Sequence, residues 1–201
     1  MRACGRAIRT YSATIALALT LAVPVLADPG HSAATDQIHI ANFGRVSASY
    51  YRGSQPEGED YAALKALGVK TVIDLQEYGE DDEPAAAKAA GLRYVKIGMN
   101  TRVDPTPAQI QQFLSIVNDP AQAPVYVHCA GGHHRTGVMT ALYRMTKDGW
   151  TGKQAFAEMK KYGFGMDFLH PEFKKFVLNY DAPPAKPADG VLATTTPALA
   201  N

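Results

Sequence analysis

The chain has 201 residues, 46% of them apolar, which suits one domain with a full core and is too short for two. Its formal net charge is +1, and without the first 27 residues, which hold three basic residues and no acidic one, the charge becomes −2. Neither value has the basic excess of a protein that binds nucleic acid or an anionic membrane surface, so we expect no nucleic-acid partner.

The N-terminus has the pattern of a secretory signal peptide. A basic segment precedes the apolar run ATIALALTLAVPVLA, and small residues lead to a cleavage position after Ala27. A transmembrane anchor is the alternative, but the run is short and interrupted by Pro24, and no apolar stretch of spanning length follows it in the sequence. We therefore expect residues 1–27 to be removed, the protein to be periplasmic or secreted, and no stable membrane span to remain.

One folded domain is expected over residues 37–180. Residues 28–36 form a flexible leader, and residues 181–201 form a disordered tail rich in Pro, Ala and Thr. Signal cleavage removes Cys4, so the mature protein has Cys129 as its single cysteine and cannot form an intramolecular disulfide. A lone thiol in an exported protein is either buried and inert or kept for its chemistry.

Short apolar runs and capping signals predict alternating strands and helices. The segment VSASYYRG is a weak strand, and stronger buried strands are expected over residues 69–75, 93–97 and 124–128. Capping boxes predict helix starts at Ser54 with Glu57, Thr106 with Gln109, and Thr151 with Gln154. The segment TGVMTALYRMTK predicts a buried helix, and Pro171 opens the last one. This order predicts an α/β fold with a central, mainly parallel sheet of four to five strands flanked by helices.

The loop CAGGHHR, directly after the strand at 124–128, has the composition of an oxyanion site. Its glycines let successive backbone N–H groups curl around a tetrahedral anion at the start of the next helix. Arg135 adds two parallel donors that match two phosphate oxygens. Sites in such sheets lie beyond the carboxyl ends of the strands, where this loop begins. The expected phosphate-binding residues are Ala130, Gly131, Gly132, His133, His134 and Arg135.

Cys129 is expected at the bottom of this anion-binding loop. The loop amides, the helix dipole and Arg135 favour the ionised thiolate, which makes the cysteine a nucleophile at neutral pH, and His128 and Thr136 are placed to tune it by hydrogen bonds. The alternative is an inert core cysteine, since free cysteine is among the most buried residue types. A cysteine, two glycines, an arginine, a hydroxyl residue and a helix-opening glycine in one loop favour attack on phosphorus.

Two segments carry a family resemblance. HCAGGHHRTG resembles the signature of cysteine-dependent protein tyrosine and dual-specificity phosphatases, which is His-Cys, five residues, Arg, Ser or Thr, and Gly. YRGSQPEGEDYAALKALGVKTVIDL resembles the N-terminal part of the atypical members, of the Siw14-like and bacterial type. The similarity extends from about Tyr50 to Phe176 and implies the fold of a dual-specificity phosphatase.

The resemblance also implies roles for individual residues. Cys129 is the nucleophile, Arg135 and the loop amides bind phosphate, and Thr136 helps the thiolate to leave in the second step. Two departures reduce the fixed positive charge near the site: members often carry a lysine where this chain has His133, and an arginine where it has Gln76. Both departures are expected to weaken binding of highly phosphorylated ligands.

A general acid must protonate the leaving group, and Asp104 in NTRVDPTP is the first candidate. It lies between a strand and a capped helix, upstream of the cysteine strand, as the acid does in the family. The alternative is that Asp104 only shapes an Asp-Pro turn. The acidic run Glu77–Glu83 could also overhang the site, although such runs are usually solvated. Asp74, inside a strand, is expected to be a buried hydrogen-bonding residue.

His133 and His134 are expected to set the polarity of the rim of the site. Adjacent residues in a tight loop point in different directions and no further ligand cluster is apparent in the sequence, so no metal is expected. Because imidazoles titrate near neutrality, the pair would favour substrates with several phosphates in mildly acidic medium. The alternative is that both rings only hydrogen-bond the loop backbone.

These features predict a phosphomonoester hydrolase that works through a phosphocysteine intermediate and needs no cofactor. The expected substrates are phosphotyrosine or phosphoserine/threonine proteins, inositol phosphates or phosphoinositides. A rhodanese-like sulfurtransferase is an alternative, but the five-residue spacing, the Arg-Thr-Gly ending and the upstream aspartate favour the phosphatase. A non-catalytic phosphate-binding module is a further alternative, disfavoured because both a nucleophile and an acid are present.

Overall fold

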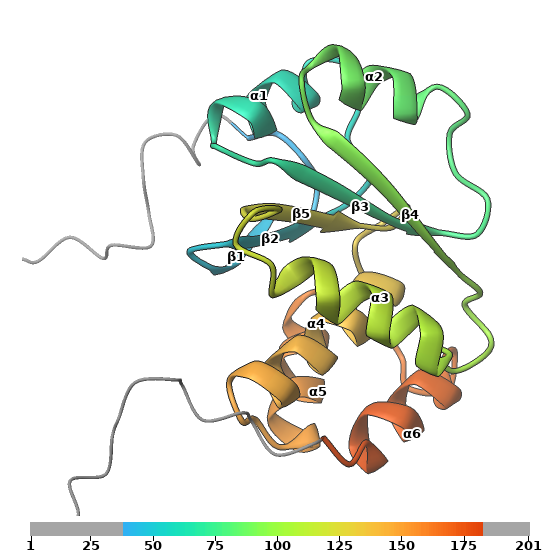
Figure 1. Ribbon diagram of the computed structural model, residues 1–201. Helices are drawn as coiled ribbons and strands as arrows, with labels where there is room; N and C mark the ends of the chain where they lie inside the picture. Colours follow the sequence, from blue (N-terminus) through green and yellow to red (C-terminus); the bar gives the residue numbers. More distant parts are fainter. Residues whose placement is uncertain (1–37, 183–201) are drawn as a thin grey trace, which may run out of the picture.

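The computed structural model describes residues 38–182, which form a sheet with helices on both faces (Figure 1). Helices α1 (Asp60–Ala66) and α2 (Glu83–Ala89) cover one face. The opposite face is covered by α3 (Pro107–Val117), α4 (Arg135–Lys147), α5 (Gly152–Lys161) and α6 (Pro171–Asn179). The molecule therefore has three layers, with the sheet between two helical layers.

The central sheet has five strands in the order β1-β2-β5-β3-β4. The strands are β1 (Gly44–Ser47), β2 (Tyr50–Gly53), β3 (Thr71–Gln76), β4 (Arg93–Met99) and β5 (Val125–His128). Only β1 and β2 pair antiparallel, and the other neighbouring strands are parallel. This topology confirms the predicted α/β class with a mainly parallel sheet.

The segment expected to form one weak strand from Val46 is instead a hairpin of β1 and β2. Gly44 lies opposite Arg52, and Ser47 lies opposite Tyr50. A two-residue turn at positions 48 and 49 reverses the chain, where the Ser49 N–H donates to Oγ of Ser47 at 3.3 Å. Serine hydroxyls favour turns by such local bonds, which explains the break in the strand.

Two of the three predicted capping boxes are confirmed. Thr106 caps α3 and Thr151 caps α5, each with reciprocal bonds to the glutamine three residues later. The box predicted at Ser54 is wrong, because α1 begins at Asp60, and the N–H of Ser54 donates to Ala41 while its carbonyl accepts from Tyr126. These long-range bonds hold Ser54 in the loop after β2.

Strand β5 contributes side chains to both faces of the sheet. Val125, Val127 and Cys129 belong to the core between the sheet and the layer of α3 to α6. Tyr126 belongs to the core under α1 and α2, and the ring of His128 stacks on it at 5.8 Å between centroids. The alternation of a strand thus places Cys129 and His128 on opposite faces of the sheet.

Within residues 38–182, no helix is both long enough and apolar enough to cross a membrane. The predicted signal peptide (1–27) and leader (28–36) lie outside the described residues. The predicted tail lies outside them as well, except for positions 181 and 182.

Candidate active site

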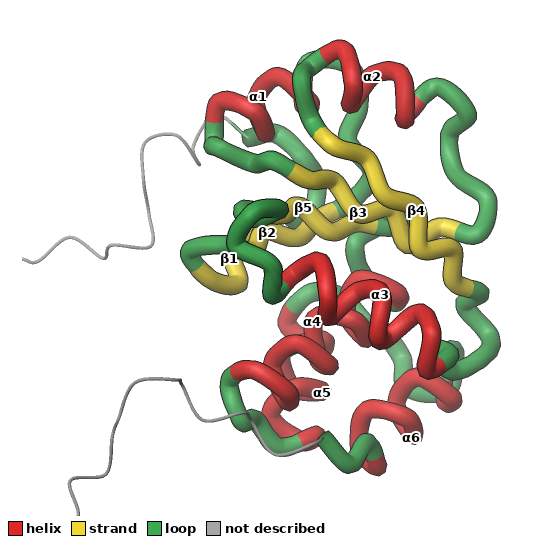
Figure 2. Tube along the Cα trace, viewed as in Figure 1, coloured by secondary structure: helices red, strands yellow, loops and turns green. Residues whose placement is uncertain are grey.

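The candidate site lies at the edge of the sheet where the parallel strands β2, β3, β4 and β5 end. Figure 2 shows the long loops that follow β3 and β4 at this edge, on the right of the view. The loop of residues 129–134, between β5 and α4, begins at the same edge. Open sheets of this class bind their ligands beyond the carboxyl ends of the strands.

Cys129 is the free cysteine of the described residues and lies at the floor of this loop, with 3% of its surface exposed. The loop leads into α4, a helix of 13 residues that begins at Arg135 and has no side-chain cap. The first-turn N–H groups of a helix need partners, and together with the helix dipole they favour a bound anion. One short loop therefore connects the thiol of Cys129 to a helix start that favours anions.

Gly132 fits the loop tightly against the end of β2. Its φ is 70°, a conformation that glycine adopts readily, and a Cβ here would be 2.5 Å from the carbonyl carbon and oxygen of Gly53. The Gln55 N–H donates to the carbonyl of Ala130 at 3.1 Å. The end of β2 and the loop after it thus support the loop of residues 129–134, which we call the phosphate loop, at Ala130 and Gly132.

Two polar side chains hold the carbonyl of Gly132. Nη2 of Arg52 donates to it at 2.6 Å, and Nδ2 of Asn42 donates to it at 3.0 Å. Asn42 also donates to the carbonyl of Tyr162 at 3.0 Å, which ties the loop to the end of α5. Sequence reasoning missed both side chains, Asn42 and Arg52, although an arginine inside a predicted strand was a visible signal.

Arg135 and Thr136 occupy the first two positions of α4. Nη1 of Arg135 donates to the carbonyl of Met99, at the end of β4, over 3.4 Å. Nε of Arg135 and Oγ1 of the buried Thr136 have no hydrogen-bond partner among the described residues. Both side chains keep donor capacity for a ligand at this helix end.

His133 and His134 are partly buried, and both contact backbone carbonyls. Nδ1 of His133 is 2.9 Å from the carbonyl of Tyr162, and Nε2 of His134 is 3.1 Å from that of Phe164. Burial lowers the pKa of His134, and the ring of His170, 3.9 Å away between centroids, lowers it further. These surroundings oppose the expected charging of His134 in mildly acidic medium and fit the backbone-bonding alternative. A role of either histidine in substrate binding stays a prediction.

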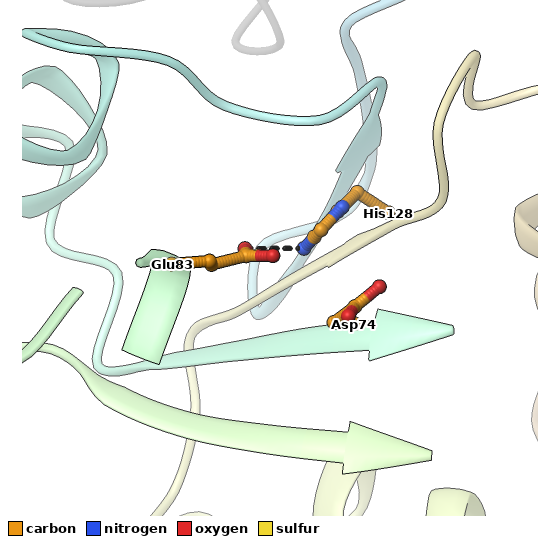
Figure 3. Close-up of side chains that lie close together, drawn as sticks. All are labelled: Asp74, Glu83 and His128. Atoms are coloured by element: carbon orange, nitrogen blue, oxygen red, sulfur yellow. Dashed lines mark ion pairs between the residues drawn. The ribbon is translucent and has the colours of Figure 1, made fainter. Parts of the chain in front are cut away.

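His128 lies on the face of the sheet opposite Cys129. Its ring pairs with Glu83 (Figure 3). Nε2 of His128 is 2.9 Å from Oε1 of Glu83, and both side chains are fully buried. Neither has an aligned hydrogen-bond partner within residues 38–182, so the contact is a close approach of an imidazole nitrogen to a carboxylate oxygen. The prediction of a solvated acidic run is therefore wrong at Glu83, because this first residue of α2 faces the sheet and cannot reach a leaving group.

Asp74 completes this buried cluster, in which the possible metal-ligand atoms of Asp74, Glu83 and His128 lie within 4.8 Å of one another. Asp74 accepts bonds from the Gln76 N–H at 2.7 Å and the Tyr94 hydroxyl at 3.0 Å, which confirms its predicted role as a buried hydrogen-bonding residue. Lys96 lies 3.6 Å from the same carboxylate. These partners already neutralise and satisfy Asp74, which disfavours it as a metal ligand.

Asp104 is exposed in the loop between β4 and α3. It lines a hollow with residues of α6 and the segment after it, and Cys129 does not line that hollow. The start of the loop is held by His170, whose Nδ1 is 3.1 Å from the carbonyl of Thr101. Asp104 thus lies at the edge where the parallel strands end, but it does not share a hollow with the thiol of Cys129. Its role as the general acid stays a prediction.

The other acids of the run follow β3 at the same edge. Glu80, Asp81 and Asp82 are exposed, and Glu77 accepts a bond from Nδ2 of Asn100 at 3.0 Å. The loop with Asp104 and the loop with the acidic run are therefore in contact where each leaves its strand, β4 and β3 respectively.

Comparison with known families identifies the chain. The family described as "DSP-PTPase phosphatase fused to NAD+ Kinase" matches residues 32–174, which is more than half of the sequence. The chain belongs to the dual-specificity phosphatase family. The match includes β1 to α5 and the whole phosphate loop, so the family signature and the loop geometry coincide.

Curated relatives of the chain are named as a dual specificity protein phosphatase and as inositol diphosphatases. The dual specificity protein phosphatase TpbA of Pseudomonas aeruginosa is 33% identical over 129 residues, which cover 62% of this chain and 56% of TpbA. The inositol diphosphatase SIW14 of Saccharomyces cerevisiae is 29% identical over 130 residues, which cover 61% of this chain and 46% of SIW14. The chain thus spans about half the length of the curated relatives it matches.

Solved phosphatase structures share the fold. The crystal structure of TpbA from P. aeruginosa has a TM-score of 0.61 and 31% identity, over 70% of this chain and 86% of the other. The core catalytic domain of the PP-IP phosphatase SIW14 from S. cerevisiae, in complex with citrate, has a TM-score of 0.61 and 26% identity, over 71% and 87%. These similarities confirm the dual-specificity phosphatase fold implied by the loop signature.

The buried pair of Glu83 and His128 leads to a prediction about stability. Glu83→Ala should lower the free energy of unfolding by roughly 3 to 5 kcal/mol, because removing one partner leaves the other buried and uncompensated. Urea denaturation followed by circular dichroism measures this change. Glu80→Ala, three residues earlier and exposed, is the matched control and should change stability by less than about 0.5 kcal/mol. Equal stability of the two variants would contradict a structural role of the pair.

Proposed function

We propose that the protein is a phosphomonoester hydrolase of the dual-specificity type that works through a phosphocysteine intermediate. The observation that carries this proposal is the free, buried thiol of Cys129 at the floor of a loop that ends at the uncapped start of α4. Anionic phosphate suits the loop amides and the helix dipole, and Arg135 supplies a planar pair of donors. The thiol is thus directly adjacent to the atoms that would hold phosphorus.

In the first step, Sγ of Cys129 attacks phosphorus. The S–P bond forms and the P–O bond to the leaving group breaks, while Asp104 gives its proton to the departing oxygen. Arg135 and the loop amides stabilise the charge on the non-bridging oxygens. The contact of Arg135 with the end of β4 supports Asp104 as the acid, because the loop of Asp104 begins directly after that strand.

In the second step, water attacks the phosphorus of phosphocysteine. The ionised Asp104 accepts a proton from the water, the S–P bond breaks, and inorganic phosphate leaves. The hydroxyl of Thr136, which has no other partner among the described residues, can donate a hydrogen bond to the departing thiolate. The chain's own residues thus supply every proton transfer of the cycle.

The proposed substrates are phosphotyrosine or phosphoserine/threonine proteins and inositol phosphates or phosphoinositides. Support comes from solved and curated relatives: a cysteine-to-serine variant of TpbA was crystallised in complex with phosphotyrosine, with 30% identity and a TM-score of 0.60 over 70% of this chain and 85% of the other. SIW14 is named an inositol diphosphatase. A phosphate held by one loop and one arginine is common to both substrate classes.

The mechanism predicts that Cys129→Ser abolishes turnover but keeps binding of phosphate analogues. The loop amides and Arg135 remain, whereas a serine hydroxyl is not ionised at neutral pH. Hydrolysis of 4-nitrophenyl phosphate and binding of vanadate measure the two properties, and chelators should not change the wild-type rate. Residual activity above about 1% of wild type in a pure preparation would exclude Cys129 as nucleophile. Faster turnover of thiosulfate than of aryl phosphate by the wild type would favour a sulfurtransferase, and vanadate binding without any hydrolysis would favour a binding module.

For Asp104→Asn we expect a loss of activity that grows with the basicity of the leaving group. The loss should be roughly 100-fold or more for an alkyl phosphate and only several-fold for 4-nitrophenyl phosphate, whose phenolate leaves without a proton. Values of kcat for a series of aryl and alkyl phosphates measure this dependence, with Asp81→Asn as the control from the exposed acidic run. Equal losses for all leaving groups would show that Asp104 only shapes the Asp-Pro turn.

We also propose that the protein is exported to the periplasm or the medium. The basic segment and apolar run at the N-terminus support this location. Expression of the full chain in a Gram-negative bacterium should yield a periplasmic or secreted protein whose N-terminal residue is Asp28, read by intact mass and N-terminal sequencing. Recovery of a chain that starts at Met1 in the membrane fraction would contradict cleavage.

A further inference from the structure

Arg52 is the largest side chain of the described residues that is fully buried. It lies in β2, opposite Val127 of β5, two residues before Cys129. Because residues two apart in a strand point to the same face, Arg52 lies on the face of its neighbour Tyr50, which shares a core with Cys129. The guanidinium is therefore buried on the cysteine side of the sheet.

The contacts of Arg52 satisfy only part of its guanidinium. Nη2 donates to the carbonyl of Gly132 at 2.6 Å, and the central carbon lies 3.9 Å from the centre of the Tyr162 ring. Nε and Nη1 are buried and have no partner within residues 38–182. Burial lowers the pKa of Arg52, yet a guanidinium remains protonated in proteins. A buried cation without a carboxylate partner is costly, so the site needs an anion.

Burial is the main cause that lowers the pKa of Arg52, and negative charge on Tyr50, Tyr162, Glu158 or Cys129 would raise it. Phenol groups are neutral at physiological pH, so neither tyrosine supplies a counter-charge. Glu158 of α5 is already paired with Arg144, whose Nη2 is 2.8 Å from its carboxylate. The remaining group of the four is the thiol of Cys129, which in its ionised form would carry the charge opposite to that of Arg52.

We propose that Arg52 is a second, buried cation of the phosphate site, which stabilises the thiolate of Cys129 and positions the phosphate loop through Gly132. The proposal rests on the proposed function in taking Cys129 as the nucleophile. Arg52 acts behind the loop and does not contact substrate, so it is a positioning residue. Its bond to Gly132 fixes the direction of that carbonyl. Its charge favours the ionised thiol before phosphate arrives.

The test measures ionisation of Cys129 without requiring catalysis. The rate of alkylation by iodoacetamide is followed from pH 5 to pH 9 in the full chain, by mass spectrometry of the peptide that contains Cys129. In Arg52→Gln, which removes the charge but keeps a side-chain donor for Gly132, the midpoint of the profile should move to higher pH by about one unit. Alkylation below neutral pH then falls roughly tenfold and converges with wild type in alkali, because a lost cation disfavours the thiolate.

Further variants separate charge from structure. Arg52→Lys retains the cation and should keep the wild-type profile, and Arg52→Met is a second neutral variant for the case in which Arg52→Gln does not fold. Arg93→Met removes the same charge at the opposite edge of the sheet, where Arg93 is exposed at the start of β4, and should not move the profile. Thr151→Ala, which loses the cap of α5, is the control for lowered stability alone.

Two outcomes would overturn the proposal. A wild-type profile in both neutral variants would show that Arg52 only anchors the loop, and a profile of Arg52→Lys equal to that of Arg52→Gln would exclude its charge as the cause. Both outcomes are independent of whether the protein hydrolyses phosphate. A shifted alkylation profile in a protein without phosphatase activity would support the role of Arg52 and contradict the proposed function.

Discussion

The site depends on the close contact between Gly132 of the phosphate loop and Gly53 at the end of β2. No side chain fits between them, since a Cβ on Gly132 would be 2.5 Å from the Gly53 carbonyl. The contact brings the Gly132 carbonyl within reach of Arg52 and Asn42. Because β2 also pairs with β5, which leads into the loop, strand pairing and loop conformation stabilise each other. The short antiparallel hairpin of β1 and β2 is thus part of the active-site support.

Because successive side chains of a strand alternate between the two faces of the sheet, His128 and Cys129 lie near different buried polar side chains. On one face His128 pairs with Glu83, and on the other Cys129 shares a core with Tyr50, while Arg52 bonds the carbonyl of Gly132. Buried polar groups reduce stability unless they are fully partnered, and they persist where function requires them. Glu83 has the imidazole of His128 at 2.9 Å, whereas Arg52 has no carboxylate paired with it among the described residues and keeps two unpartnered nitrogens. This difference is the physical reason to connect Arg52, and not Glu83, with an anion.

Sequence reasoning succeeded where the signal was local. The phosphate loop, the buried α4 and the capping boxes at Thr106 and Thr151 each depend on residues within a few positions of one another. It failed where a local pattern competed with a distant contact. Ser54 had a capping pattern, but its backbone bonds to Ala41 and Tyr126. Glu83 stood in a charged run, but its position at the start of α2 turned it toward the sheet.

The sequence by itself determined the class of fold, the nucleophile candidate and the anion-binding loop, because strand alternation, capping and the spacing from Cys129 to Arg135 are short-range properties of the chain. Only the tertiary structure decided what surrounds that loop. Asn42 lies 90 residues from Gly132 and 120 residues from Tyr162, and Arg52 lies 80 residues from Gly132. Contacts over such separations follow from strand order and packing, which no short sequence pattern records.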